Sequence, residues 1–152
     1  MGDKPLEIFL FKSCNAAVCT QAYSELLNKS RILSKAVCSV VGALRGAEVN
    51  VIVVDGRAIR GLNERFRNQD RSTDVLSFPI DGSILGEVWI CPSVIVENAK
   101  LANEDFEREL LRVVVHGLLH LAGYDHKSHY TDYTEKSTEK MFELQEKILS
   151  RI

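Results

Sequence analysis

The sequence lacks the features that would mark a membrane or exported protein. No apolar run reaches the roughly 20 residues of a membrane-spanning helix, and no basic region followed by an apolar stretch stands at the N-terminus. The four cysteines include no close Cys-x-x-Cys pair. These absences predict a cytoplasmic protein without membrane association and with reduced thiols, in which Cys19 and Cys38 are small buried apolar residues.

The sequence also lacks repeats, linkers and low-complexity segments. Its 152 residues are 45% apolar and 26% charged, the balance of an ordinary soluble globular protein. A chain of this length can bury most of its apolar surface in one core. We therefore predict a single domain over residues 1–152.

Apolar spacing predicts an alternation of strands and helices. We expect strands at 6–11, 48–55, 75–78 and 84–90, and helices at 16–27, 33–44, 58–67, 93–102, 104–122 and 134–151. Such an alternation favours an α/β (α+β) fold, in which a small mixed sheet of about four strands is packed with about five to six helices.

All four histidines of the chain lie between positions 116 and 129. His116 and His120 are four apart, so they project from the same face of the predicted helix. Gly123 can end that helix in a left-handed conformation and turn the chain so that His126 approaches from the side. Three imidazoles with one coordination position left open are typical of a catalytic zinc site. We therefore predict a metal site at the end of a central helix.

Two other interpretations of the histidines are possible. A single histidine on an apolar helix is usually a core residue with a satisfied hydrogen bond, but two imidazoles without partners there would each cost about 1–3 kcal/mol. Structural zinc sites usually fill all four positions and favour cysteine, and no cysteine lies near these histidines.

The histidine spacing also matches the metzincin proteases, but one essential residue is missing. Those enzymes carry a glutamate directly after the first histidine as general base, and this chain has Gly117 there. A site of three neutral ligands leaves the full positive charge on the ion. That charge favours an anionic substrate such as a phosphodiester.

Three ordered motifs resemble the YbeY family of bacterial metal-dependent endoribonucleases, and the resemblance covers roughly residues 47–146. Residues 116–126 read HGLLHLAGYDH, similar to the family's HGxLHLxGYDH. Residues 62–79, LNERFRNQDRSTDVLSFP, resemble LNxxYRxxDxxTDVLSFP, with Phe66 replacing tyrosine. Residues 85–88, LGEV, resemble LGDI, with Glu87 replacing aspartate.

The resemblance implies a function and a set of site residues. It implies an endoribonuclease that acts on single-stranded RNA in maturation of the 16S rRNA 3′ end and in ribosome quality control. One Zn²⁺ would be held by His116, His120 and His126, with His116 also counted as catalytic. Arg67, at the family's arginine position, would grip the scissile phosphate. The attacking group would be a metal-activated hydroxide or the 2′-hydroxyl of the RNA itself.

The distribution of charge along the sequence indicates how the protein would bind RNA. The net charge is −2, yet five arginines lie between positions 57 and 71 against only two acidic residues. Apart from Arg67, we expect most of them, including Arg57, Arg60 and Arg65, to form a solvated helix face. So sparse a basic surface predicts weak affinity for RNA alone. A ribosomal subunit or ribosome-associated proteins would then supply much of the docking.

Several further residues are weaker candidates for the site. Asp125 could orient a ligand imidazole or simply form a turn, and Glu87 could act as a base if it faced the metal. His129 could be a spare ligand, but we favour an exposed loop residue. Strand and turn chemistry explain Thr73 and Ser77, and Tyr124 is expected to pack.

Two rival functions remain open. A zinc hydrolase of peptides or small molecules would share the metal but ignore RNA. A ribosome-assembly factor with a structural metal would bind ribosomal particles without cleaving RNA, and it would lose its fold when the metal is removed.

Overall fold

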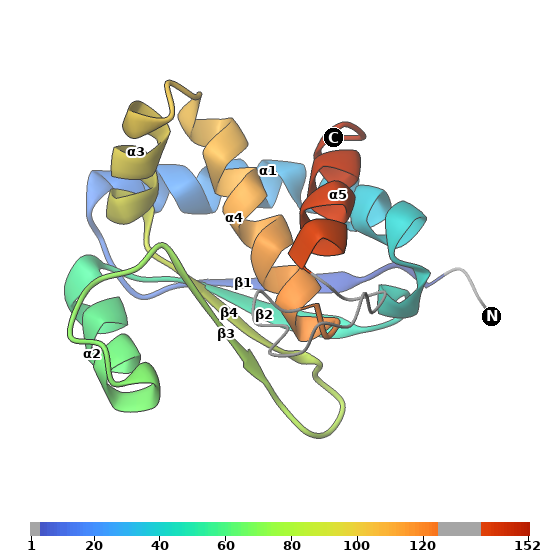
Figure 1. Ribbon diagram of the computed structural model, residues 1–152, viewed down its shortest axis with the longest axis horizontal. Helices are drawn as coiled ribbons and strands as arrows, with labels where there is room; N and C mark the ends of the chain where they lie inside the picture. The colour runs from blue at the N-terminus through green and yellow to red at the C-terminus, as the bar shows by residue number, and fades with distance from the viewer. Residues whose placement is uncertain (1–3, 125–137) are drawn as a thin grey trace.

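The computed structural model describes residues 4–124 and 138–152, which contain one mixed four-stranded sheet (Figure 1). The strands are β1 (Glu7–Lys12), β2 (Glu48–Val53), β3 (Val75–Pro79) and β4 (Gly86–Ile90). Their order in the sheet is β1-β2-β4-β3, in which β1, β2 and β4 are parallel and β3 is antiparallel to β4. The two edge strands are therefore β1 and β3.

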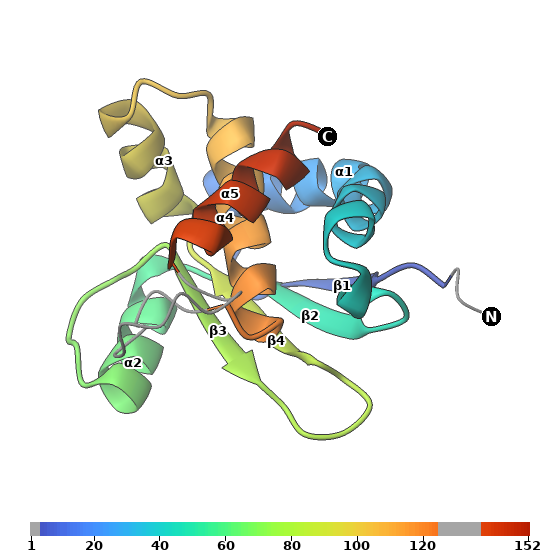
Figure 2. The same cartoon turned by 45° about the vertical axis from the view of Figure 1, so that its right-hand side comes forward.

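Helices cover the two faces of the sheet unequally. On one face lie α1 (Ala17–Val40), α3 (Pro92–Leu101), α4 (Phe106–Leu121) and α5 (Thr138–Leu149), while α2 (Gly56–Arg67) lies on the other (Figures 1 and 2). A short 3-10 helix, η1 (Gly42–Leu44), follows α1. Helix α4 packs against α5, α3 and β3, so it is central to its layer.

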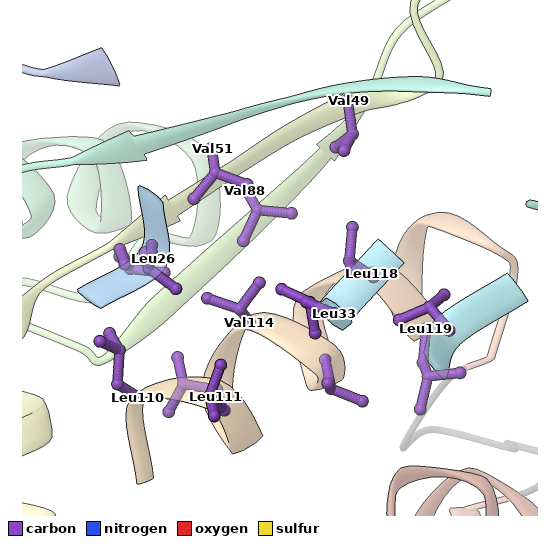
Figure 3. Packing of buried hydrophobic residues seen from close by; sticks show 14 of the residues in the cluster. Leu26, Leu33, Val49, Val51, Val88, Leu110, Leu111, Val114, Leu118 and Leu119 are labelled. Atoms are coloured by element: carbon purple, nitrogen blue, oxygen red, sulfur yellow. The ribbon is translucent and has the colours of Figure 1, made fainter. Parts of the chain in front are cut away.

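The main core lies between the sheet and α4. Alternation along the strands turns Val49, Val51 and Val88 toward the helices, where they pack with Val114 and Leu118 of α4 (Figure 3). Side chains on the other face of the sheet, such as Ile52, form a smaller cluster, which Ile59 of α2 covers. Helix α4 is apolar on most of its surface because it is buried between the sheet and α5.

The structure confirms the predicted fold class. Each of the four expected strands is present, with five α-helices in the described ranges, and most element ends lie within one or two residues of the predicted ends. The expected helix at 134–151 is described only from Thr138, where α5 begins. Among the residues described, no helix is long and apolar enough to cross a membrane.

The prediction of two helices at 16–27 and 33–44 was wrong. The structure has one 24-residue helix, α1, which runs without a break through the segment between the two predicted helices. Residues 28–32 contain only polar or weakly helix-disfavouring side chains and neither glycine nor proline, so nothing in them ends a helix. The apolar stripe of α1 continues across this segment to Leu33.

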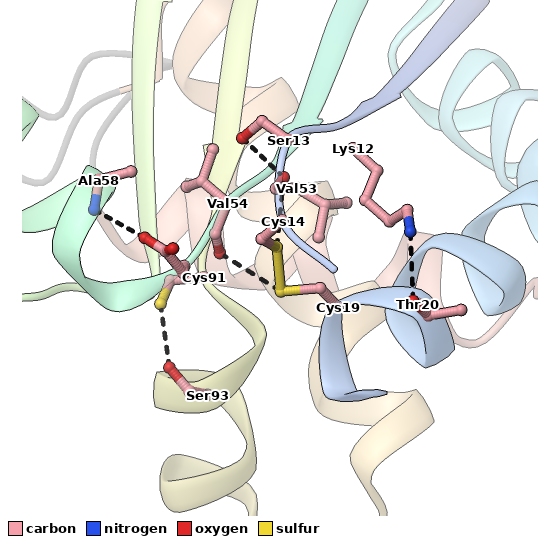
Figure 4. The surroundings of a disulfide bond; sticks show 11 residues. Lys12, Ser13, Cys14, Cys19, Thr20, Val53, Val54, Ala58, Cys91 and Ser93 are labelled. Carbon is pink, nitrogen blue, oxygen red and sulfur yellow. Dashed lines mark hydrogen bonds between the residues drawn. A yellow bond between two sulfur atoms is a disulfide. The ribbon is translucent and has the colours of Figure 1, made fainter. Parts of the chain in front are cut away.

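The prediction that all thiols are reduced was wrong for two of the four cysteines. Cys14 and Cys19 form a disulfide, and both sulfur atoms lie 3.9 Å from carbonyl oxygens at the end of β2 (Figure 4). The first turn of α1 carries Cys19 back toward the loop that holds Cys14. The expected burial of Cys19 and Cys38 is confirmed.

Candidate metal centre and cleft

A cleft of about 1010 Å³ lies where α2, β3 and the C-terminal end of α4 meet. Both described histidines line it, together with residues from the segment that joins α2 to β3 and from α3. The lining residues that matter below are Asn63, Phe66, Arg67, Gln69, Arg71, Thr73, Asp74, Ser77, Asn98, His116, His120 and Tyr124.

The two histidines face each other in this cleft. His116 and His120 lie one turn apart on α4, each half-buried, with their Nε2 atoms 3.2 Å apart. Two nitrogens that each lie about 2.0–2.1 Å from a tetrahedral zinc ion are separated by about 3.3 Å. The observed separation therefore fits two ligands of one ion.

Gln145 of α5 determines which nitrogen of the His116 imidazole carries a proton. Its Oε1 lies 3.0 Å from Nδ1 of His116, and the residue is only 3% exposed. An amide oxygen only accepts hydrogen bonds, so Nδ1 of His116 must carry the proton. In the neutral form of the ring, the lone pair then lies on Nε2, the atom that faces His120. A polar partner on the far nitrogen is the usual support of a metal-binding histidine.

The third predicted ligand, His126, lies outside the described residues, as do Asp125 and His129. Within the described ranges, no three histidine, cysteine, aspartate or glutamate side chains come together as a metal-binding group. The pair His116 and His120 is thus the part of the expected zinc site that the structure describes.

The turn after α4 has the predicted conformation. Ala122 ends the helix, and Gly123 has a positive φ of 100°. The amide of Gly123 donates to the carbonyl of His120, and that of Tyr124 donates to the carbonyl of Leu119. A left-handed glycine ends the helix and redirects the chain directly after the second histidine.

The residue between the histidine positions leaves no space for a side chain. A Cβ atom added to Gly117 would lie 2.6 Å from Cγ1 of Val88 and 3.1 Å from Oγ of Ser77. The Ser77 hydroxyl also donates to the Gly117 carbonyl at 3.1 Å. The glycine that replaces the metzincin glutamate therefore allows the close approach of α4 to the sheet.

Arg67, in the last turn of α2, lines the same cleft as the two histidines. It is exposed, and none of the described residues forms an ion pair with it. Arg60 differs, because it forms a salt bridge with Asp70, with Nε and Oδ1 2.7 Å apart. The hydrogen bond from Arg60 lowers the pKa of the Asp70 carboxyl, and the same pair raises the pKa of Arg60. Arg57 and Arg65 are exposed on α2, as expected for a solvated face.

The segment after α2 is held against the helix by side chains. Asn68 ends α2 in the left-handed region with φ 57°. Buried Asn63 donates from Nδ2 to the Arg71 carbonyl at 2.9 Å, and the Ser72 hydroxyl donates to the Gly56 carbonyl at 3.0 Å. These contacts fix the wall of the cleft that carries Arg71 and Thr73.

The remaining candidates have different positions. Glu87 cannot be a base at the histidines, because Val88 points toward α4 and alternation turns Glu87 to the opposite face. There it accepts a hydrogen bond from the Trp89 indole at 3.2 Å. Tyr124 packs against the core as expected. Thr73 and Ser77 line the cleft.

Sequence reasoning missed two residues of this site. Gln145 is 29 residues from His116, and no local pattern indicates that α5 packs against that face of α4. Phe66 was treated only as a replacement for tyrosine, although it is 59% exposed in the cleft. An aromatic residue between two arginines, Arg65 and Arg67, was the one signal available for it.

Comparisons with known proteins agree with the motifs. The family model described as Endoribonuclease YbeY matches residues 13–152. A curated Endoribonuclease YbeY from Thermotoga maritima is 48% identical over 105 residues, covering 68% of this chain and 67% of that protein. One from Chlorobium luteolum is 42% identical over 113 residues, covering 72% of this chain and 81% of that protein. The solution structure of TM1509 from Thermotoga maritima has a TM-score of 0.65 at 39% identity, covering 95% and 87% of the two chains.

Proposed function

Because the chain belongs to the YbeY family of endoribonucleases, and so is a nuclease that acts on RNA, we propose that it is a zinc-dependent enzyme specific for single strands. One Zn²⁺ is held by His116, His120 and His126, and Arg67 binds the scissile phosphate. The biological role is maturation of the 16S rRNA 3′ end and ribosome quality control, carried out in the cytoplasm by a single domain of residues 1–152.

The facing Nε2 atoms of His116 and His120, 3.2 Å apart, carry this proposal. Gln145 on the opposite ring nitrogen of His116 supports it, since that contact leaves the lone pair available at the shared point. Zinc bound there supplies Lewis-acid activation of water and of a phosphoryl oxygen.

Arg67 supplies the cationic group for the substrate. It shares the cleft with the histidines and has a planar guanidinium that matches two phosphate oxygens at once. Such a group stabilises the charge that grows on the non-bridging oxygens during phosphodiester cleavage. Arg71 lines the same cleft and adds a second cationic group to it.

Docking to a ribosomal subunit or to ribosome-associated proteins completes the proposal. The chain has a net charge of −2, and Arg60 is already paired with Asp70. The net negative charge opposes non-specific contacts with RNA, so a partner would provide the affinity that the isolated chain lacks.

Substitution of Arg67 tests the assignment of the site. We expect Arg67→Ala to lower kcat/KM for a single-stranded RNA roughly 100-fold, as removal of a preorganised charge donor does elsewhere. The kcat/KM of Arg67→Lys should lie between those of the wild-type protein and Arg67→Ala, because lysine keeps the charge and loses the bidentate contact.

Arg65→Ala is the matched control, since Arg65 is exposed on the same helix and does not line the cleft. Equal losses in Arg65→Ala and Arg67→Ala would mean that α2 contributes only general charge, and Arg67 would lose its assigned role.

A further inference from the structure

The cleft contains an exposed aromatic side chain that the reaction itself does not require. Phe66 is 59% exposed and lines the same cleft as the two histidines. Burying a phenylalanine side chain is normally favourable by about 1.5–3 kcal/mol, so a ring left open in a cleft suits a ligand better than it suits folding.

The Phe66 ring contacts a second aromatic ring. Phe66 and Phe78 have ring centroids 5.1 Å apart at an interplanar angle of 60°. Phe78 belongs to β3 and packs on the small cluster beneath α2. The contact supports Phe66 against the sheet while most of its surface stays open to the cleft.

The surroundings indicate what binds to this ring. Arg67, the adjacent residue, lines the same cleft and offers a cationic group to phosphates. Arg71 lines it too, and its Nε and Nη2 donate hydrogen bonds to Oε1 of Gln69. Asn98 in the lining offers an amide group. An aromatic face beside a phosphate-binding cation and a polar amide matches a nucleotide with an unpaired base.

We propose that Phe66 is a stacking platform for one unpaired nucleobase of the RNA, adjacent to the phosphate held by Arg67. This inference rests on the proposed function and deepens it, because it gives a physical origin for single-strand specificity. A base in a duplex already stacks on both of its faces and cannot reach the ring without being extruded.

The test compares Phe66→Leu and Phe66→Tyr with the zinc-loaded wild-type protein on twelve-nucleotide single-stranded RNAs. Phe66→Leu should raise KM roughly 10-fold and leave kcat nearly unchanged, since stacking acts on ground state and transition state alike. Phe66→Tyr should keep the wild-type KM because the ring remains.

Phe11→Leu is the matched control. Phe11 is 51% exposed, similar to Phe66, but it lies on the opposite edge strand and does not line the cleft. We expect Phe11→Leu to cleave with the wild-type KM.

RNAs that each carry one abasic nucleotide identify the stacked base. One abasic position should raise the wild-type KM to the Phe66→Leu value, and Phe66→Leu should be indifferent to that same change. Independent, additive effects of the protein and RNA changes would overturn the platform.

Quenching of 2-aminopurine placed at that position measures stacking without cleavage. Quenching by wild type but not by Phe66→Leu, without cleavage by either, would support the platform and contradict the proposed reaction. If the wild-type protein and Phe66→Leu cleaved with the same KM and quenched equally, the result would contradict the platform and leave the reaction supported. Neither cleavage nor quenching by the wild type would contradict both.

Discussion

Gln145 supports the geometry of the histidine pair through a buried hydrogen bond. It reaches His116 from a different helix and accepts a hydrogen bond from Nδ1, which leaves Nε2 as the basic nitrogen. The two rings meet edge to face, with centroids 4.7 Å apart, so a tilt of either ring would separate the Nε2 atoms. The carboxamide is buried, so no bulk water stands ready to replace it.

We therefore expect Gln145→Leu to weaken zinc binding about 10- to 100-fold, because it removes the partner of the imidazole and leaves Nδ1–H unsatisfied. Competition with a chromophoric chelator measures the affinity. Gln145→Glu, which can still accept the hydrogen bond, should stay close to wild type. Equal zinc affinity in Gln145→Leu and the wild-type protein would show that the contact does not support the metal.

Among the elements, α4 is the one whose packing positions the site. Its close approach to β4 depends on Gly117, where any Cβ would meet Val88. The helix carries both described histidines, so a displacement of α4 from the sheet would move them together relative to Arg67 on α2.

Gly117→Ala should lower the free energy of unfolding by up to about 2 kcal/mol. The overlap with Val88 costs about 1–3 kcal/mol, and the higher helix propensity of alanine offsets about 1 kcal/mol of this. Gly61→Ala in α2 is the control, because a Cβ there meets nothing within 4 Å, and it should stabilise by about 0.5–1 kcal/mol. Chemical denaturation measures the free energy of unfolding of both variants. If Gly117→Ala and Gly61→Ala changed that free energy in the same direction, the packing argument would be refuted.

The disulfide between Cys14 and Cys19 also contributes to the stability of an element, because it anchors the start of α1. It closes a short loop between Cys14 and Cys19 and fixes the helix beside the end of β2 (Figure 4). Chain-entropy arguments give about 2 kcal/mol for a loop of this size. A reducing agent should therefore lower the midpoint of thermal unfolding for the wild-type protein and leave Cys14→Ser unaffected. An unchanged midpoint on reduction would show that the bond contributes nothing to stability.

For the molecule as a whole, local patterns predicted the elements better than their arrangement. The β-branched run of β2 and the four-residue spacing of His116 and His120 act within one element, so the sequence reveals them directly. The order β1-β2-β4-β3 depends on pairing between distant segments, which no local pattern specifies. The sequence analysis missed Gln145 for the same reason, because its contact with His116 joins two segments that are distant in the sequence.

Errors in the sequence predictions arose where a local signal was weak. Residues 28–32 are mostly polar and interrupt the apolar spacing, but packing against the core stabilises one continuous α1. The pairing of Cys14 with Cys19 depends on the first turn of α1, and the spacing of the two cysteines alone does not indicate it.

The most direct test of the central proposal, a zinc-dependent cleavage of RNA at the histidine pair, is cleavage of a labelled single-stranded RNA that carries a ribosomal 3′-end sequence. Wild type and His120→Ala are purified identically, and their folding is compared by circular dichroism. We expect the wild-type protein to cleave, a chelator to stop it, added zinc to restore it, and His120→Ala to be at least about 100-fold slower. Equal cleavage by both proteins, or no cleavage by zinc-loaded wild type, would contradict the proposed reaction at this site.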